Sequence, residues 1–518
     1  MTDRVPFEPR CSDLPTNPRT DIGPVLVTGA AGYIGGRLVP ELAARGYKVR
    51  AMVRGGGETG DLASWPEVEI VLGDALDRES LDRVLEGVSV AYYLIHSLVL
   101  GPEEFARADL ESARNFREAA RKAGVQRIIY LGGLGATEDR LSAHLDSRQQ
   151  VAVELAGGSV PCTFLRASII IGSGSASFEI IKALIDRLRV IPFPAWADNL
   201  GQPIGIRDVL KYLVGVMEAP LEGNQTFDIG GLEVMTYRQM MDEVSSVLGK
   251  PTRFIDVPVR GTRLVSYAIN LLTPVPAPIA KCLVEGLRDD TVCDSTAIRR
   301  LIPFTPISYR AALVRALSRE EQDRVATRWS DAYPPAHELA IKLYQLRRPP
   351  RYRAAYSLET KRPAAALFTA INRIGGREGW FNVNWMWRAR GAFDRMIFGV
   401  GTARGRRSAR ELRIGDVIDF WRVEDLQWNR RLLLRAEMRM PGRAWLEFDI
   451  KDEQDHRRLG ITAHYATKSL WGDMYWRLFQ PFHWYIFEHL LTQINLRSKE
   501  FEADAQANPQ IKNRGAVS

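Results

Sequence analysis

Residues 24–166 alternate between short apolar runs and segments whose apolar positions have helical spacing. Strands that alternate with helices form parallel sheets, because each crossover returns the chain to the same edge. The pattern therefore predicts a Rossmann-like, doubly wound α/β sheet, with ligands outside the carboxyl ends of its strands. We expect strands over residues 25–27, 48–53, 68–72, 88–95, 127–131 and 162–166, and long helices over residues 103–123 and 143–155.

A glycine-rich turn follows the first of these strands. Gly29, Gly32 and Gly35 lie between the apolar run 25–27 and a helical pattern that continues through Leu38. Glycine permits a tight turn and close approach of a ligand, and the helix N-terminus favours a pyrophosphate. A plain strand-to-helix turn is the alternative. The predicted dinucleotide contacts in this segment are Gly29, Ala31, Gly32, Tyr33, Ile34, Gly35 and Arg37.

The next part of the chain, residues 167–326, has a less regular pattern. It predicts helices over residues 177–188 and 206–217 and a short strand over 225–229. We expect these segments to form a small substrate lobe, so that residues 23–326 make one dinucleotide-binding domain. Residues 1–22 are polar and contain several prolines, which favours a disordered lead-in over a signal peptide.

After a linker rich in proline and arginine, the pattern changes. Residues 327–360 are expected to be a helical connection and linker, and a second domain is expected over 361–505, before a disordered tail at 506–518. Apolar and polar residues alternate over 415–423, 430–438, 444–450 and 459–466, and an aromatic-rich helical pattern covers 471–496. This predicts an α+β, helix-grip-like domain: an antiparallel sheet around a long C-terminal helix, an arrangement that commonly encloses an apolar cavity.

Composition narrows the class of protein. The chain has 518 residues, 46% of them hydrophobic, which is enough for two or three globular domains. The four cysteines form no C-x-x-C pair, so we expect no zinc site and a reducing compartment, the cytoplasm. Proline interrupts the longest apolar stretch, residues 265–284, so no membrane-spanning helix is expected.

Charge and tryptophan are concentrated towards the C-terminus. Residues 341–440 hold 22 Lys and Arg against 9 Asp and Glu, and nine of the twelve tryptophans lie at or beyond Trp380. Basic and aromatic residues together can bind nucleic acid or an anionic membrane. Because the arginines alternate with apolar residues, we favour a solvated face over a Trp-rich core, with no nucleic-acid partner.

The choice of dinucleotide depends on the end of the second strand. NAD-selective sites usually carry an acidic residue there, whereas this chain has Arg54, which can pair with a 2′-phosphate. The sequence therefore favours NADP, with NAD as the alternative, and Arg37 and Arg50 lie near enough in sequence to assist. Asp74 and Ala75, after the third strand, are expected near the adenine, although Asp74 could instead cap a helix.

Hydride transfer to a carbonyl also needs a proton donor, commonly Tyr with Lys four residues later on one helix. Here the corresponding helix contains His144 and Arg148. His144 can donate a proton near neutral pH, and Arg148 can bind the nicotinamide ribose. A solvent-exposed histidine and arginine are the alternative. His96 and Ser97, after the fourth strand, are also expected near the nicotinamide.

With these motifs, residues 24–325 resemble an atypical short-chain dehydrogenase/reductase of the NmrA-like, complex-I-associated branch. The resemblance rests on residues 28–35, 93–97, 129–133, 144–148 and 165–175. Residues 471–476 and 481–483 are similar to the end of a segment of unknown function called DUF2867. The resemblance implies a Rossmann fold and dinucleotide binding. The sequence departs from the catalytic Ser-Tyr-Lys pattern of such enzymes, because Gly132 and Gly133 occupy the position where the serine is expected.

Three functions follow from these observations. The first is an NADP-dependent oxidoreductase for an apolar carbonyl or quinone-like substrate. The second is a non-catalytic dinucleotide sensor or scaffold. The third is a peripheral lipid-binding protein in which residues 471–484 lie at a membrane surface. The alternative is that these aromatic residues belong to the core and line a cavity, and we favour this alternative.

Overall fold

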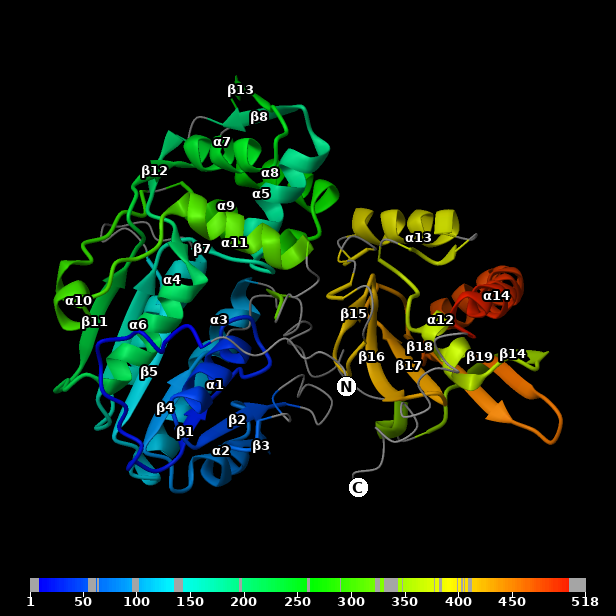
Figure 1. Ribbon diagram of the computed structural model, residues 1–518, viewed down its shortest axis with the longest axis horizontal. Coiled ribbons are helices and arrows are strands. Elements are labelled where there is room, and N and C mark those ends of the chain that lie inside the picture. Colours follow the sequence, from blue (N-terminus) through cyan, green and yellow to red (C-terminus); the bar gives the residue numbers. More distant parts are fainter. Residues whose placement is uncertain are drawn as a thin grey trace. The chain divides into compact units, whose positions relative to one another are not determined.

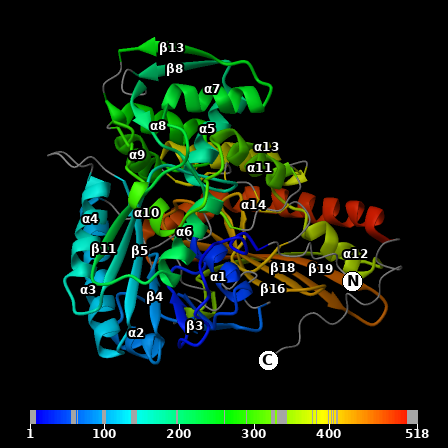
Figure 2. The ribbon, with the colours of Figure 1, turned by 60° about the vertical axis from the view of Figure 1, so that its left-hand side comes forward.

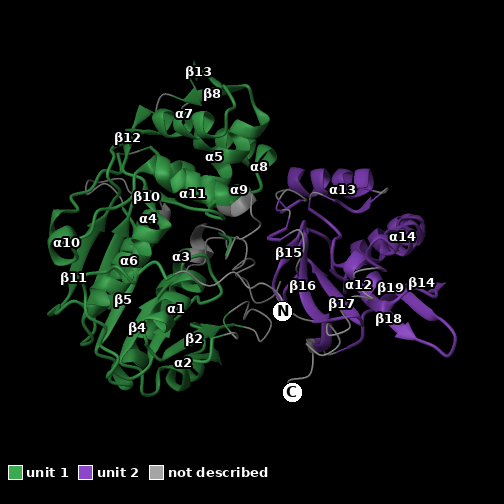
Figure 3. Cartoon of the chain, in the orientation of Figure 1, with its two compact units in different colours: residues 1–336 green, residues 337–518 purple. Residues whose placement is uncertain are grey.

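The computed structural model divides the chain into two compact units, Met1–Ala336 and His337–Ser518, coloured separately in Figure 3. Each unit has its own sheet and its own buried residues. The structure describes residues 9–54, 62, 65–95, 102–134, 143–194, 198–258, 261–288, 290–321, 327–329, 343–346, 348–376, 378–381, 384–397, 399–401, 404, 406–408 and 412–502.

The first unit is built on a seven-stranded sheet in which all pairings are parallel (Figure 1). Its order is β11-β6-β5-β4-β1-β2-β3, so the direction of progression reverses between β1 and β4. This confirms the predicted doubly wound sheet. The strands are β1 (Val25–Val27), β2 (Val49–Val53), β3 (Val68–Leu72), β4 (Val90–Tyr93), β5 (Arg127–Gly133), β6 (Cys162–Ala167) and β11 (Gln225–Ile229).

Helices cover both faces of this sheet, and alternate residues of each strand face opposite layers. On β4, Val90 and Tyr92 pack with α1 (Gly35–Ala44) and α6 (Ile206–Glu218). Ala91 and Tyr93 pack on the other side with α2 (Arg78–Leu85), α3 (Pro102–Lys122) and α4 (Ala143–Ala156). Because both faces are covered, the central strands β1 and β4 are apolar and buried at every position.

The small lobe of this unit consists of paired short strands and surrounding helices (Figure 2). The pairs are β7 (Ile170–Ile171) with β10 (Ile204–Gly205), β8 (Val190–Pro194) with β13 (Arg253–Val257), and β9 (Leu200–Gly201) with β12 (Met235–Thr236). The helices are α5 (Ala176–Arg187), α7 (Tyr237–Val247), α8 (Thr262–Leu272), α9 (Ala277–Gly286) and α11 (Tyr309–Glu321), whereas α10 (Thr296–Leu301) packs against β11 of the main sheet.

Two segments assigned to this lobe by the sequence belong to the main sheet instead. Strand β11 pairs with β6 in a parallel register from Gln225 opposite Thr163 to Ile229 opposite Ala167. Helix α6 is buried along most of its length against the sheet. The prediction was wrong because a short strand carries no local signal that says which sheet it joins.

The prediction of a disordered lead-in over residues 1–22 is also wrong for the part that the structure describes. Cys11 is fully buried and Leu14 nearly so, in the core that contains α1. The backbone N–H groups of Arg10 and Cys11 donate to Glu41 Oε2 at 2.7 and 3.1 Å. A buried carboxylate needs donors, and this segment supplies them to Glu41, whose pKa burial raises.

The second unit contains a six-stranded antiparallel sheet and a long C-terminal helix, as predicted. The order is β14-β19-β18-β17-β16-β15. The sequence predicts a linker up to residue 360, and this prediction is wrong for Tyr352–Thr360, which form strand β14 of the sheet. The other strands are β15 (Val417–Ile418), β16 (Trp421–Gln427), β17 (Arg431–Ala436), β18 (Arg443–Asp452) and β19 (Arg457–Ala466); the helices are η5 (Leu343–Gln345), α12 (Ala364–Ile371), α13 (Asn384–Met396), α14 (Leu470–Arg497) and η7 (Ser498–Phe501).

Helix α14 runs along β14, and aromatic rings join the two elements. Trp476 stacks on Tyr352 and on Tyr465 of β19, with ring centroids 5.5 Å apart in both pairs. Further along, Phe487 meets Tyr356 at 5.6 Å. Strand β14 alternates between residues that face α14 and exposed residues, a pattern that the neighbouring arginines and prolines obscure in the sequence. Among the described residues, no helix is long and apolar enough to span a bilayer.

Candidate functional site

The glycine turn lies where the strand order reverses, between the carboxyl ends of β1 and β4. Gly29 has a φ of 62°, and a Cβ at this position would lie 2.8 Å from the Leu94 carbonyl oxygen. A Cβ on Gly35 would overlap the Gly29 carbonyl. The Gly32 N–H donates to the Gly29 carbonyl at 2.9 Å and closes the turn. These positions exclude a side chain for steric reasons, which agrees with the predicted roles of Gly29 and Gly35.

Thr28 joins the two strand ends, a role that the sequence analysis did not identify. Its buried hydroxyl donates to the Tyr92 carbonyl and accepts from the Leu94 N–H, both at 3.0 Å. The hydroxyl therefore fixes the spacing between β1 and β4 directly beneath the turn. A threonine immediately before the first glycine was the only signal of this role in the sequence.

Helix α1 begins at Gly35 with no side-chain cap and no acidic residue in its first turn. The positive end of its dipole is therefore not neutralised by a side chain of its own, which suits a bound phosphate. Ala31 and Ile34 are half-buried and pack their side chains against the core. Together with the glycine turn, this arrangement fits the pyrophosphate of a dinucleotide.

Tyr33 directs its side chain away from the turn. Its hydroxyl is buried against Gly172, where a Cβ would lie 2.6 Å from the phenolic oxygen. Burial raises the pKa of Tyr33, although the nearby Arg37 guanidinium, 4.2 Å from the ring centroid, opposes this effect. The tyrosine side chain therefore packs the first turn of α1 against the small lobe.

Arg37 is not at the end of β2, where the sequence analysis expected it to assist NADP binding. It is only 4% exposed, and its guanidinium donates to the carbonyls of Ser173 at 2.8 Å and Thr327 at 2.9 Å. The direction of an arginine on a helix depends on the acceptors around it, and here these acceptors lie far away in the sequence. Arg50 is likewise engaged elsewhere, with Glu69 at 2.7 Å and with two carbonyls of the α2 region.

Arg54 follows β2 directly and is exposed. The Gly73 N–H donates to the Val53 carbonyl at 3.0 Å, so the segment after β3 lies beside Arg54. Asp74 accepts from the Leu76 N–H at 3.0 Å, whereas the cap of α2 is Asp77. The structure therefore brings Arg54 and Asp74 to one edge of the sheet, and the alternative of Asp74 as the helix cap does not hold. Ala75 is buried beside them.

The predicted catalytic residues follow β5. His144 lies in the first turn of α4, but its side chain is outside the described part of the structure, as are His96 and Ser97. Arg148 Nη1 donates to the Leu131 carbonyl at 3.1 Å, which places Arg148 beside the carboxyl-terminal half of β5. The helix that carries His144 and Arg148 therefore packs at the expected strand end.

The absence of a serine after β5 has a steric reason. A Cβ on Gly132 would lie 2.6 Å from the Phe164 ring, and a Cβ on Gly133 would lie 2.9 Å from Leu145. The ring of Phe164 also stacks on Tyr130 with centroids 5.1 Å apart. A serine at position 132 would therefore require movement of a buried aromatic pair.

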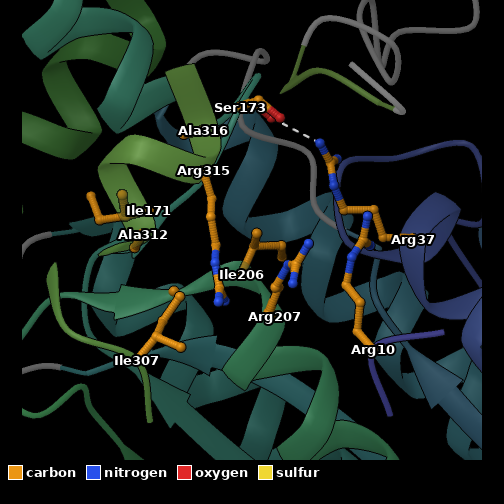
Figure 4. Close-up of a pocket in the computed structure, with 12 residues that line it drawn as sticks. Arg10, Arg37, Ile171, Ser173, Ile206, Arg207, Ile307, Ala312, Arg315 and Ala316 are labelled. Atoms are coloured by element: carbon orange, nitrogen blue, oxygen red, sulfur yellow. Dashed lines mark hydrogen bonds between the residues drawn. The ribbon is translucent and has the colours of Figure 1, made fainter. Parts of the chain in front are cut away.

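An open pocket lies between β7, β10, α6 and α11 (Figure 4). Four arginines contribute to it: Arg10, Arg37, Arg207 and Arg315. Arg207 and Arg315 extend towards the same space, while Arg10 and Arg37 approach from the side of α1. Arginines this far apart in the sequence form no local motif, so the sequence analysis could not identify the pocket. Among the described residues, no cluster of His, Cys, Asp and Glu suits a metal ion.

A doubly wound sheet with a glycine turn at its reversal point defines an NAD(P)-binding protein of the short-chain dehydrogenase/reductase type. More narrowly, the chain belongs to the NmrA-like family, whose model matches residues 22–285. Residues 347–490 match a second model, described as a protein of unknown function, DUF2867. Both matches confirm the resemblance seen in the sequence.

Three curated relatives are each similar to about half of this chain. Sterol demethylase protein B of Methylococcus capsulatus is 36% identical over 325 residues, covering 57% of this chain and 97% of that protein. Ceramide reductase of Caulobacter vibrioides is 29% identical, covering 46% of this chain and 75% of that protein. A (4-alkanoyl-5-oxo-2,5-dihydrofuran-3-yl)methyl phosphate reductase of Streptomyces griseus is 26% identical, covering 51% and 85%. Among solved structures, Bordetella bronchiseptica WbmG in complex with NAD and UDP has a TM-score of 0.47 and 15% identity, covering 60% of this chain and 98% of that chain.

Proposed function

We propose that this protein is an NADP-dependent oxidoreductase that acts on an apolar carbonyl or quinone-like substrate. The observation that carries the proposal is the glycine turn at the sheet reversal, with Arg54 following β2 where NAD-selective sites carry an acidic residue. The guanidinium of Arg54 can pair with a 2′-phosphate but cannot accept a hydrogen bond from a ribose hydroxyl.

The residues around the strand ends have separate roles in this proposal. The backbone of residues 29–35 and the start of α1 hold the pyrophosphate, Arg54 holds the 2′-phosphate, and Asp74 accepts from the adenine amino group. When bound, a reduced nicotinamide supplies a hydride to the carbonyl carbon of the substrate. His144 then donates a proton to the carbonyl oxygen, and Arg148, His96 and Ser97 orient the reacting groups.

The apolar substrate class is supported by the names of two relatives. One is named for a sterol and another for ceramide, and this chain covers 97% and 75% of their respective lengths. The third relative is named a reductase as well. Sterols and ceramide are apolar molecules, which supports an apolar substrate for the carbonyl or quinone reduction proposed here.

The decisive experiment is oxidation of NADPH by the purified protein with a panel of hydrophobic aldehydes, ketones, enones and quinones. We expect turnover with at least one of these compounds, and a loss of about 10²–10⁴-fold in kcat for His144→Ala with little change in NADPH affinity. Asp146→Ala, an exposed change on the same helix, is the matched control and should retain activity. No turnover above background across the panel, or full activity of His144→Ala, would contradict the proposal.

A dinucleotide sensor without catalysis is the second candidate. It is favoured by the steric exclusion of a serine at Gly132, since the Phe164 ring occupies the space. This candidate predicts tight NADPH binding without hydride transfer to any member of the panel. It also predicts that NADPH changes the affinity for a protein partner, and an equal affinity in the presence and absence of NADPH would count against it.

A further inference from the structure

The first half of α14 exposes a stripe of large apolar side chains. Trp471, Met474, Leu478, Phe482 and Tyr485 have spacings of 3, 4, 4 and 3, which place them on one face of the helix. They are 71%, 54%, 63%, 48% and 43% exposed. A contiguous exposed apolar surface of this kind marks an interaction site.

This observation corrects the interpretation that the aromatic residues of 471–484 line a core or cavity. Trp476 does face the sheet and is buried, but Trp471 and Trp484 are 71% and 58% exposed. The second half of the helix differs, because the exposed residues there include Glu488, His489 and Thr492. The stripe is therefore confined to the N-terminal half of α14, and Leu496 near the end of the helix is exposed apart from it. Figure 2 shows the ribbon of α14 along its length.

Helix α13 extends this surface. It exposes Trp385, Phe393 and Met396 at 66%, 55% and 54%. Arg390 of α13 donates to the Tyr475 hydroxyl of α14 at 3.4 Å and to the Arg439 carbonyl at 3.0 Å. The two helices and the loop between β17 and β18 are therefore neighbours in the second unit. We call their exposed residues the α13–α14 surface.

The exposed charges within the segments that carry this surface are basic, and the next exposed acidic residue along α14, Glu488, lies one turn beyond Tyr485. In residues 384–397, 437–443 and 467–485, the exposed charged side chains are Arg388, Arg439, Lys468 and Arg477. The acidic residues of the same segments are withdrawn: the side chains of Asp394, Glu437 and Asp473 are 0%, 1% and 14% exposed. An apolar, aromatic surface with a basic surround complements an anionic lipid headgroup layer.

We propose that the α13–α14 surface binds the surface of an anionic lipid bilayer. The tryptophan and tyrosine rings enter the interface, where their apolar body and polar edge are both accommodated, and the basic side chains pair with lipid phosphates. A second copy of this chain is a poorer occupant, because a symmetric contact would bring like charges together.

The test is co-sedimentation of the full-length protein with vesicles of phosphatidylcholine alone or mixed with an equal amount of phosphatidylglycerol. We expect binding to the mixed vesicles at low ionic strength, weaker binding to phosphatidylcholine, and release as salt is added. Lys468→Gln with Arg477→Gln should weaken binding to mixed vesicles by about 25-fold, about fivefold for each charge, and leave binding to phosphatidylcholine unchanged.

The apolar contribution is tested with a variant carrying Trp471→Ser, Leu478→Ser and Phe482→Ser. These side chains are exposed, so we expect the variant to fold, and to bind mixed vesicles at least about 100-fold less tightly. Leu264→Ser, which removes a 65% exposed leucine from the first unit, is the control and should bind like the parent protein. Failure of the parent protein to bind mixed vesicles would overturn the proposal. So would unchanged binding by the triple variant, or a dimer of the parent protein that the triple variant makes monomeric.

Discussion

At the scale of single residues, the glycine turn is specified by steric exclusion. The Gly29 backbone has a positive φ, and the space beside its Cα is filled by the Leu94 carbonyl. The second condition follows from the parallel pairing of β1 with β4, which brings Leu94 against the turn. A residue with a Cβ would therefore disturb the backbone that faces the dinucleotide.

Gly29→Ala should lower NADPH affinity by at least about tenfold and destabilise the first unit by more than about 1 kcal/mol. Gly223→Ala is the matched control, because Gly223 has a φ of 57° with open space around it. This control should lose only the free energy of unfolding that a Cβ costs at a residue with positive φ, and it should bind NADPH like the parent protein. Titration of NADPH fluorescence and urea unfolding would measure both effects, and equal behaviour of the two variants would contradict the steric explanation.

Arg54→Gln tests the choice of cofactor at the same scale. Loss of a charge-assisted pair with the 2′-phosphate should weaken NADPH binding by about 10- to 100-fold and leave NADH binding nearly unchanged. Arg78→Gln, a half-exposed change at the start of α2, should alter neither affinity. Calorimetric titration with both dinucleotides would measure the difference, and parallel losses for NADPH and NADH would refute a 2′-phosphate contact.

At the scale of elements, the strands of the second unit are joined by buried charges as well as by apolar packing. Glu437 is paired with Arg404 at 2.8 Å and with Arg422 at 2.6 Å, and both pairs are almost fully buried. Burial alone would raise the pKa of Glu437, but the guanidiniums of Arg422, Arg404 and Arg435 outweigh it and lower the pKa to about 2. The ionised carboxylate therefore stabilises the folded state at neutral pH.

Glu437→Gln should destabilise the second unit by about 3–5 kcal/mol at pH 7, because the arginines lose the carboxylate that they share. Since the folded pKa lies below the ordinary value of 4.5, this stabilisation is fully present above that pH and is lost as the pH falls towards about 2. Urea unfolding of the parent protein and of Glu437→Gln at decreasing pH should show that the difference between their free energies of unfolding becomes smaller below pH 4.5. Glu453→Gln, at a half-exposed position, should change the free energy of unfolding by less than about 0.5 kcal/mol.

At the scale of the whole molecule, the chain consists of two units with separate sheets and separate cores. Only the first unit contains the glycine turn and the strand ends around it. Ligand binding stabilises the folded state of the unit that binds, by an amount set by ligand concentration relative to Kd. The two units should therefore respond differently to the cofactor.

Calorimetry of the full chain should show two unfolding transitions. NADPH at about 100 times its Kd should raise the midpoint of one transition by about 4 °C. Glu437→Gln should lower the midpoint of the other. A single transition that both changes shift would show that the units unfold together.

The sequence by itself determined the class of each unit. Hydrophobic periodicity is a local property, so it predicted the alternating strands and helices, the antiparallel strands of the second unit and the helix over 471–496. Glycine spacing predicted the turn, because the steric demand for Gly29 and Gly35 is nearly the same wherever a strand, a tight turn and a helix meet. Arg54 and Asp74 come together for a similar reason, since β2 and β3 are adjacent parallel strands.

Only the tertiary structure decided which partners these local elements find. Arg37 donates to the Ser173 and Thr327 carbonyls, and β11 pairs with β6 in the main sheet. Strand β14 pairs with β19, although the sequence predicts a linker there. The exposure of the aromatic residues on α14 was also decided there, because a helix that is apolar on several faces does not reveal which face meets the sheet. Contacts between residues far apart in the sequence depend on the shapes and charges of both sides, and neither segment encodes them alone.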